Sequence, residues 1–279
     1  MNLSPLNISA LLRSYGLTPR KSLGQNFLVD PTALERIIQA AEIPPGSTIL
    51  EVGPGLGSLT RYLALVANRV VAVELDGALI PPLEHVLNGL PNVEIVHADI
   101  LKIAPGDFIF EDNYLVVANI PYYITSNLIR HLLEAPQKPN RIVLTVQREV
   151  AERITATPND MNLLALSVQV YGSPKISMRI PAGAFYPPPT VDSSVVRIDL
   201  YPQPIISPTQ LDIFFRLAKA GFGQKRKTLR NSLSAGLSWP GERTAQLLLK
   251  AGIDPQRRAE TLGLQEWKTL VELYAAEEG

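Results

Sequence analysis

Short runs of apolar, β-branched residues alternate with segments of helical periodicity over the first two hundred positions. Five such runs come first, and each predicts a strand: residues 48–52, 70–74, 93–97, 114–119 and 141–147. Segments with helical spacing lie between or after them, at residues 56–67, 125–133 and 149–155. Alternation of strand and helix is typical of a parallel sheet with helices on both faces, so the pattern predicts an α/β fold.

The pattern changes after residue 170. Residues 175–180 and 194–200 predict two more strands, and a proline-rich segment joins them in place of a helix. They are expected to form an antiparallel hairpin at one edge, which gives a mixed sheet of seven strands. Beyond Pro204 only helices are predicted, at 211–222, 245–251 and 265–276. We therefore expect a sheet domain over 1–204 and a small all-helical domain over 205–279.

The amino-acid composition excludes several kinds of functional site. The chain has no cysteine, which excludes disulfides and thiolate chemistry, and its three histidines are irregularly spaced, so no metal site is expected. The N-terminal residues lack the pattern of a signal peptide, and no stretch approaches the roughly 20 apolar residues that span a bilayer. The expectation is a cytoplasmic protein without membrane contact. No hydrophobic stripe predicts a dimer, so a monomer is expected.

Basic residues gather in two segments that lack acids. One precedes Asp30, and the other runs from Arg216 to Arg230 with six basic residues, although the net charge of the whole chain is zero. Such segments are either solvated surfaces or contacts for a phosphate backbone, and both interpretations stay open. The RNA-binding candidates are Arg20, Lys21, Lys225, Arg226, Lys227 and Arg230.

A glycine turn follows the first predicted strand. Gly53, Gly55 and Gly57 are spaced G-x-G-x-G and open a helix, where backbone can approach a ligand closely. Ser58 stands where a dinucleotide fingerprint has its third glycine, which argues against NAD, and no lysine is present to bind phosphates. By itself, such a turn is as often a plain strand-to-helix connection.

Acidic residues at the ends of the next two strands support a cofactor. Glu74 ends the second strand about 20 residues after the turn, where a carboxylate can accept both hydrogens of a ribose diol. Asp99 follows the third strand and can accept a hydrogen bond from an adenine amino group. These acids meet at the carboxyl edge of a parallel sheet, and the ligand that fits them best is S-adenosylmethionine.

The fourth strand ends in Asn119-Ile120-Pro121-Tyr122 at the same edge. A turn is the ordinary interpretation of Asn and Pro, but methyl transfer to an exocyclic amine explains the set better. The Asn119 side-chain oxygen and the Ile120 carbonyl can accept the amine hydrogens, Pro121 fixes the backbone, and Tyr122 offers a face for the base. Phe185, before a proline run, is either a core residue or the opposite wall of this base site; we favour the wall.

These motifs together resemble the ribosomal RNA adenine N6,N6-dimethyltransferase family. The resemblance covers almost the whole chain: KSLGQNFLVD, ILEVGPGLGSLT, VVAVELD, HADIL, NIPYYITSNLI, VQREVAERI, FYPPPTVDSSVV and KRKTLRNSL. It implies a Rossmann-like class I methyltransferase domain with a helical C-terminal domain. It also implies cofactor contacts from Asn26, Leu28, Gly53, Glu74, Asp99 and Asn119.

The resemblance further implies the substrate: two adjacent adenosines in a hairpin near the 3′ end of small-subunit ribosomal RNA, each dimethylated within a late pre-30S particle. One departure is visible at Asn162-Leu163, where the family pattern leads us to expect a Tyr-Gly pair. Three alternatives stay open. They are a large-subunit methyltransferase of the macrolide-resistance type, a non-catalytic ribosome-assembly or transcription factor, and a DNA or protein amine methyltransferase. The KRKTLRNSL segment favours the small-subunit enzyme, and the intact Glu74, Asp99 and NIPY residues favour catalysis.

Overall fold

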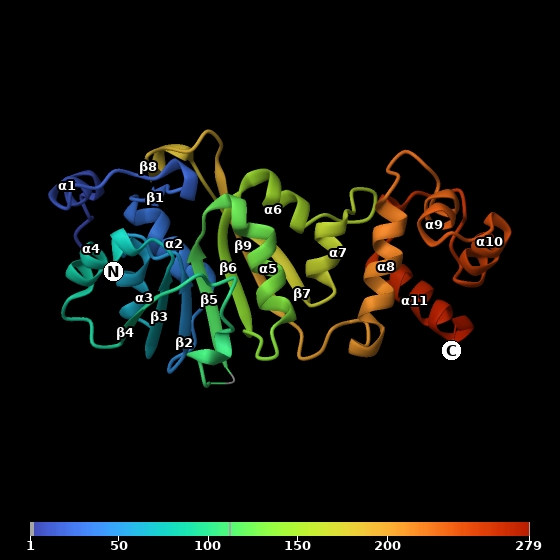
Figure 1. Cartoon of the computed structure of the whole chain (residues 1–279), viewed down its shortest axis with the longest axis horizontal. Coiled ribbons are helices and arrows are strands. Elements are labelled where there is room, and N and C mark those ends of the chain that lie inside the picture. The colour runs from blue at the N-terminus through green and yellow to red at the C-terminus, as the bar shows by residue number, and fades with distance from the viewer. Residues whose placement is uncertain (1–2, 112, 279) are drawn as a thin grey trace. The chain divides into compact units, whose positions relative to one another are not determined.

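The computed structural model describes residues 3–111 and 113–278. A seven-stranded sheet forms its centre, with the strand order β4-β3-β2-β5-β6-β9-β7 (Figure 1). The strands are β2 Thr48–Val52, β3 Arg69–Glu74, β4 Val93–His97, β5 Tyr114–Asn119, β6 Arg141–Gln147, β7 Gly172–Ile180 and β9 Ser193–Leu200. All seven predicted strands are present, and the predicted mixed α/β sheet is confirmed.

Strand direction places the functional motifs at one edge. The pairs β2–β3, β3–β4, β2–β5 and β5–β6 are parallel, and β9 runs antiparallel to β6. In β2 every residue is buried, as expected for a strand covered on both faces, whereas β4 at the sheet edge is only partly buried. The predicted neighbours β7 and β9 lie side by side, with β7 at the other edge. The carboxyl ends of β2, β3, β4 and β5 therefore lie together.

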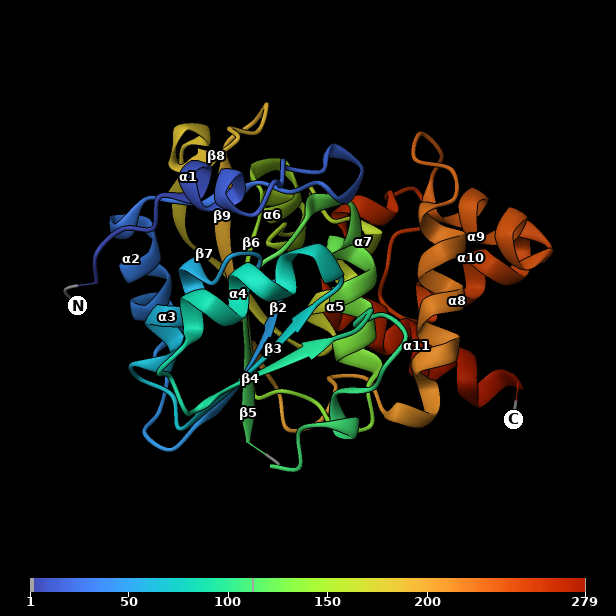
Figure 2. The same ribbon diagram turned by 60° about the vertical axis from the view of Figure 1, so that its left-hand side comes forward.

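Helices cover both faces of this sheet. The helices that precede β7 in the chain are α1 Ile8–Ser14, α2 Pro31–Ala41, α3 Ser58–Ala64, α4 Ile80–Leu87, α5 Thr125–Glu134, α6 Arg148–Ile154 and α7 Leu163–Gln169. Apolar side chains of α2 and α3 form one core cluster with residues of β2, β3, β5, β6 and β9. In the two views, α5 lies on the opposite face of the sheet from α2 and α3 (Figures 1 and 2).

A second, very short sheet was not predicted. Strand β1 Phe27–Leu28 pairs antiparallel with β8 Phe185–Tyr186, so that Leu28 faces Phe185 in the register. The backbone N–H groups of Val29 and Asp30 both donate to the Ala184 carbonyl oxygen. This pairing joins segments more than 150 residues apart and brings the QNFL segment to the glycine turn.

The chain divides into two compact units. The first comprises residues 1–151 and 174–200, and the second comprises residues 152–173 and 201–279. This division differs from the expected boundary at 204 because residues 152–173, which include α7, pack with the C-terminal helices. Backbone hydrogen bonds join the two segments of the second unit. The Tyr201 N–H donates to the Tyr171 carbonyl, and the Ile205 N–H donates to the Val170 carbonyl.

The second unit is helical after residue 201, as predicted. Its helices there are α8 Leu211–Phe222, α9 Leu229–Leu237, α10 Gly241–Lys250 and α11 Leu264–Glu278, of which α9 was not predicted. Trp267 is fully buried at its centre, and its ring lies 2.7 Å from the position that a Cβ on Gly221 would take. A glycine at 221 is therefore required by the close approach of the indole.

Candidate active site

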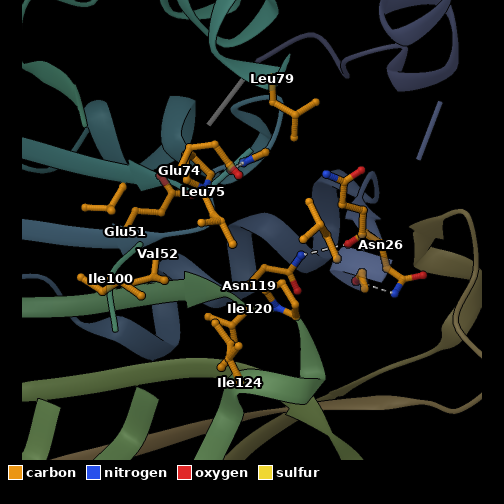
Figure 3. A pocket seen from close by; sticks show the side chains of 18 of the residues that line it. Asn26, Glu51, Val52, Glu74, Leu75, Leu79, Ile100, Asn119, Ile120 and Ile124 are labelled. Atoms are coloured by element: carbon orange, nitrogen blue, oxygen red, sulfur yellow. Dashed lines mark hydrogen bonds between the residues drawn. The ribbon is translucent and has the colours of Figure 1, made fainter. Parts of the chain in front are cut away.

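One pocket lies at the carboxyl ends of β2, β3 and β5, in the first unit. It is lined by residues from segments far apart in the sequence, from Leu23 to Phe185. Every residue predicted for the cofactor or for the amine lines it: Asn26, Leu28, Gly53, Gly55, Glu74, Asp99, Asn119, Ile120, Pro121, Tyr122 and Phe185. Figure 3 shows how several of them converge from different strands.

The glycine turn lies directly against Glu74. Gly55 has φ +60°, and a Cβ there would lie 3.0 Å from the Phe27 ring, so the position needs glycine for both conformation and space. Its N–H donates to Glu74 Oε2 at 3.0 Å. The other carboxylate oxygen, Oε1, accepts from the Asp76 N–H at 2.8 Å. Two backbone donors thus fix the Glu74 carboxylate beside the turn.

Burial raises the pKa of Glu74, while the hydrogen bonds from the Asp76 and Gly55 backbone work in the opposite direction. The side chain is only 6% exposed. A carboxylate retains acceptor capacity beyond the two bonds it makes here, so it can still accept from a ligand hydroxyl. Asp99 is more open: its Oδ1 accepts from the Leu101 N–H at 3.1 Å, and Oδ2 lies 3.5 Å from the Lys102 ammonium.

The NIPY segment begins at the end of β5 and faces the QNFL segment. Asn119 Nδ2 donates to the Asn26 carbonyl oxygen at 3.3 Å, a contact drawn in Figure 3. With the amide nitrogen directed at Asn26, the side-chain oxygen of Asn119, which is the acceptor of the amide, is available to a ligand. Asn26 is itself oriented by a bond from its Nδ2 to the Gly24 carbonyl at 3.1 Å.

The two aromatic residues predicted to hold the base have different surroundings. Tyr122 is half-buried, and its hydroxyl lies 2.6 Å from the Ser193 hydroxyl, which fixes the ring. Burial raises the pKa of Tyr122, so the phenol stays neutral. Phe185 is 4% exposed and belongs to the main core cluster, yet it also lines the pocket. Phe185 is therefore a core residue that also lines the pocket, and its role as a wall of the base site stays a prediction.

Glu51 is a pocket residue that the sequence analysis missed. It lies in the middle of β2, is 1% exposed, and its Oε2 has no hydrogen-bond partner among the described residues. Burial, reinforced by the nearby Glu74 charge, raises the pKa of Glu51 to about 8. Glu51 is therefore mostly protonated at neutral pH. The signal was available as a lone acid within the apolar run Ile49–Val52.

The basic candidates lie outside this pocket. Arg20 forms an ion pair with Asp76 at 2.8 Å, whereas Lys21 is exposed in a short 3-10 turn. In the second unit, no acid of the part of the chain that is described pairs with the exposed basic residues near the start of α9. They are Lys225, Arg226, Lys227 and Arg230. RNA binding by these six residues stays a prediction.

Asn162, where the sequence departs from the family pattern, caps a helix. Its side-chain oxygen accepts from the Ala165 N–H at 3.0 Å at the start of α7. Its Nδ2 donates to the Arg153 carbonyl at 2.9 Å. The departure is thus a local capping arrangement.

Within residues 3–111 and 113–278, no group of three or more His, Asp or Glu side chains is arranged to hold a metal ion. None of the helices described there is both long and apolar enough to cross a bilayer.

A family model and named proteins match nearly the whole chain. A family model described as "Ribosomal RNA adenine dimethylase" matches residues 16–276. A protein of Dehalococcoides mccartyi strain CBDB1 named "Ribosomal RNA small subunit methyltransferase A" is 49% identical over 267 residues, 95% of this chain and 91% of that protein. A protein of the same name from Pelotomaculum thermopropionicum is 43% identical over 284 residues, 97% of this chain and 96% of that protein.

Solved structures show the same fold. A dimethyladenosine transferase from Plasmodium falciparum has a TM-score of 0.80 at 26% identity, covering 90% of this chain and 98% of that chain. The 23S rRNA methyltransferase ErmE has a TM-score of 0.74 at 29% identity, covering 89% of this chain and 99% of that chain. The predicted Rossmann-like methyltransferase fold is therefore confirmed.

Proposed function

The chain belongs to the ribosomal RNA adenine dimethylase family, and from this premise we propose that it dimethylates N6 of two adjacent adenosines near the 3′ end of small-subunit ribosomal RNA. The observation that carries the proposal is the convergence of the cofactor residues and the NIPY segment on one pocket. The methyl donor is S-adenosylmethionine.

The residues present fit this donor. Glu74 offers a carboxylate for the ribose hydroxyls, and Asp99 lies at the next strand end for the adenine amino group. Gly55 and Phe27 both line the pocket, and the close packing of the Phe27 ring on Gly55 leaves no space for a Cβ at that position. Asn26 and Asn119 add amide groups on the side of the pocket that faces the NIPY segment. The carboxylate of Glu74 suits a positively charged donor, whereas Glu51 is held neutral by its burial.

When bound, S-adenosylmethionine supplies an electrophilic methyl group. The role of the chain is to position the adenine amine. The Asn119 side-chain oxygen and the Ile120 carbonyl accept the amine hydrogens, which draws the nitrogen lone pair out of conjugation with the ring. Tyr122, held by Ser193, stacks on the base. The proton leaves after the methyl arrives, so the site needs no strong base.

The small subunit is favoured over the large subunit as the substrate. Relatives at 43% and 49% identity carry the small-subunit name, whereas the large-subunit enzyme ErmE is 29% identical. We also propose that the chain acts as a monomer in the cytoplasm on a late pre-30S particle. A non-catalytic role is disfavoured because the predicted cofactor and amine residues are all present and line one pocket.

The exposed cluster Lys225, Arg226 and Lys227 is proposed to contact the RNA backbone. Replacing all three by glutamine should weaken RNA binding and reduce the slope of log K against log salt by about 2. Lys250→Gln is the matched control in the same unit, because that lysine is engaged with Glu277 at 2.6 Å. An unchanged affinity and slope would remove the cluster from the RNA interface.

Transfer of labelled methyl from S-adenosylmethionine to isolated subunits tests the substrate. Small and large subunits from a strain that lacks the small-subunit modification are offered separately. We expect label in the small subunit alone. Label in the large subunit would assign the chain to the resistance type, and tight small-subunit binding without label would assign it to assembly factors.

A further inference from the structure

The loop that carries Asn26 is held to the loop after β3 by a single buried carboxylate. Asp76 Oδ1 accepts from the Arg20 guanidinium at 2.8 Å, and Oδ2 accepts from Gln25 Nε2 at 2.8 Å. The Asp76 side chain is only 4% exposed, and its Oδ1 also takes the Ala78 N–H at 3.1 Å. Arg20 and Gln25 mark the two ends of the loop before Asn26, so one carboxylate holds both ends.

The Gln25 amide has one orientation that satisfies both of its neighbours. Its oxygen accepts from the Arg20 N–H at 2.8 Å, and its nitrogen donates to Asp76. A rotation of the amide by half a turn would place its nitrogen against the Arg20 N–H and its oxygen against the Asp76 carboxylate. The loop conformation is therefore defined by complementary polar groups rather than by packing alone.

The same aspartate is hydrogen-bonded to a residue of the proposed cofactor site. The Asp76 backbone N–H donates to Glu74 Oε1 at 2.8 Å, and Glu74 is the proposed ribose ligand. At the other end of the loop, the Asn26 carbonyl accepts from Asn119 at 3.3 Å. Between them, the position that a Cβ on Gly24 would take lies 3.4 Å from both Pro121 and Tyr123, so the loop rests on the NIPY segment.

We propose that Asp76, Gln25 and Arg20 form a latch that positions the loop 20–26 over the pocket and links its closure to the orientation of Glu74. These three are positioning residues that act through Glu74 and Asn26. The inference rests on the proposed function, because it takes Glu74 and Asn26 as cofactor ligands. In this proposal Arg20 positions the loop through Asp76, whereas the charge pattern of the sequence predicted that Arg20 contacts a phosphate.

An exchange of groups within the latch tests the proposal. Gln25→Glu keeps the shape of the side chain but places a carboxylate against Asp76. In the double variant with Asp76→Asn, the carboxylate lies at position 25 and the amide at position 76. The amide of residue 76 can then donate to the carboxylate of residue 25, so every hydrogen bond of the latch can form again. The readouts are the affinity for S-adenosylhomocysteine by calorimetry, the melting temperature, and hydrogen exchange of residues 20–26.

Gln25→Glu should weaken cofactor binding by about 10- to 100-fold, the usual worth of a hydrogen bond to a charged group. It should also speed exchange in the loop while the melting temperature changes little. The double variant should recover most of the affinity. Ser22→Ala, an exposed change in the same loop, is the control and should match wild type.

Two results would overturn the latch. One is a Gln25→Glu variant that binds S-adenosylhomocysteine like wild type; the other is a double variant no better than Gln25→Glu. A fall in melting temperature with unchanged affinity would mean that the contacts serve folding alone. Failure of the proposed function is separable, because then wild type itself would not bind S-adenosylhomocysteine or methylate subunits.

Discussion

Glu51→Gln should change how stability depends on pH, because the neutral amide copies the shape of the protonated carboxyl. Glu51 is 1% exposed in the centre of β2, and burial raises its pKa from 4.5 to about 8. Between these pH values the folded protein holds a proton on Glu51 that the unfolded chain has released. Wild-type stability relative to the variant therefore falls as pH rises through this window.

The magnitude follows from the size of the shift. Each pH unit inside the window removes about 1.4 kcal/mol from the stability of wild type relative to the variant. Across the full window from 4.5 to about 8 this sums to roughly 5 kcal/mol. Contributions of other titrating groups cancel to a first approximation, because both proteins share them.

The assay is urea unfolding followed by circular dichroism, at several pH values from about 5 to about 8.5. Fluorescence is unsuitable, because Trp239 and Trp267 both lie in the second unit, whereas Glu51 lies in the first. Glu84→Gln, at an exposed position on α4, is the control and should run parallel to wild type. Parallel curves for Glu51→Gln as well would refute the buried proton.

Three further changes probe other parts of the site and core. Gly55→Ala places a Cβ 3.0 Å from the Phe27 ring on a residue whose φ is +60°. The variant should bind S-adenosylhomocysteine at least about tenfold more weakly by calorimetry. Unchanged affinity would contradict the need for glycine at this turn. Ser193→Ala frees the Tyr122 hydroxyl and should lower kcat roughly two- to tenfold with cofactor affinity unchanged, whereas an unchanged kcat would remove Ser193 from the base site. Arg197→Ala should lower the free energy of unfolding, measured in urea, by roughly 2 to 4 kcal/mol, because Arg197 donates to the Ala40 carbonyl and pairs with Asp199. Arg197→Lys should restore part of this free energy. A loss below about 1 kcal/mol for Arg197→Ala would contradict the role given to these contacts.

The central sheet could be predicted because its strands are continuous apolar runs. Residues 48–52, 93–97, 114–119 and 141–147 match the observed strands, since each run is bounded by turn residues and has no competing helical period. The shared location of Glu74 and Asp99 could be predicted for a related reason. Parallel strands bring their carboxyl ends to one edge, so position in the sequence was enough to place Glu74 and Asp99 together.

Other features depended on contacts between distant segments. Strands β1 and β8 have two residues each, which is too short to show an alternation of apolar and polar residues. They are recognised as strands only because they pair with each other, with Leu28 opposite Phe185. Helix α9 follows a basic segment and has few apolar residues, so its pattern was weak. The latch of Arg20 and Gln25 on Asp76 joins groups about 50 residues apart that no local rule pairs.

The charge pattern of the sequence does not show which ion pairs form. Arg20 belongs to an acid-free segment of the sequence, which suggested a phosphate contact, yet its partner Asp76 comes from a different strand end. Conversely, Glu51 looked like part of a motif, and only its burial shows that it is held neutral. Both cases show that the environment of a charge is set by tertiary structure.

The most direct measurement of the central claim is a map of the product. Small subunits that lack the modification are incubated with S-adenosylmethionine and either wild type or Asn119→Ala, and the RNA is digested and sequenced by mass spectrometry. We expect dimethyladenosine at two adjacent positions near the 3′ end, formed at least about 100-fold more slowly by the variant. Methylation elsewhere, or an equal rate with Asn119→Ala, would contradict the assignment of this pocket as the adenine site.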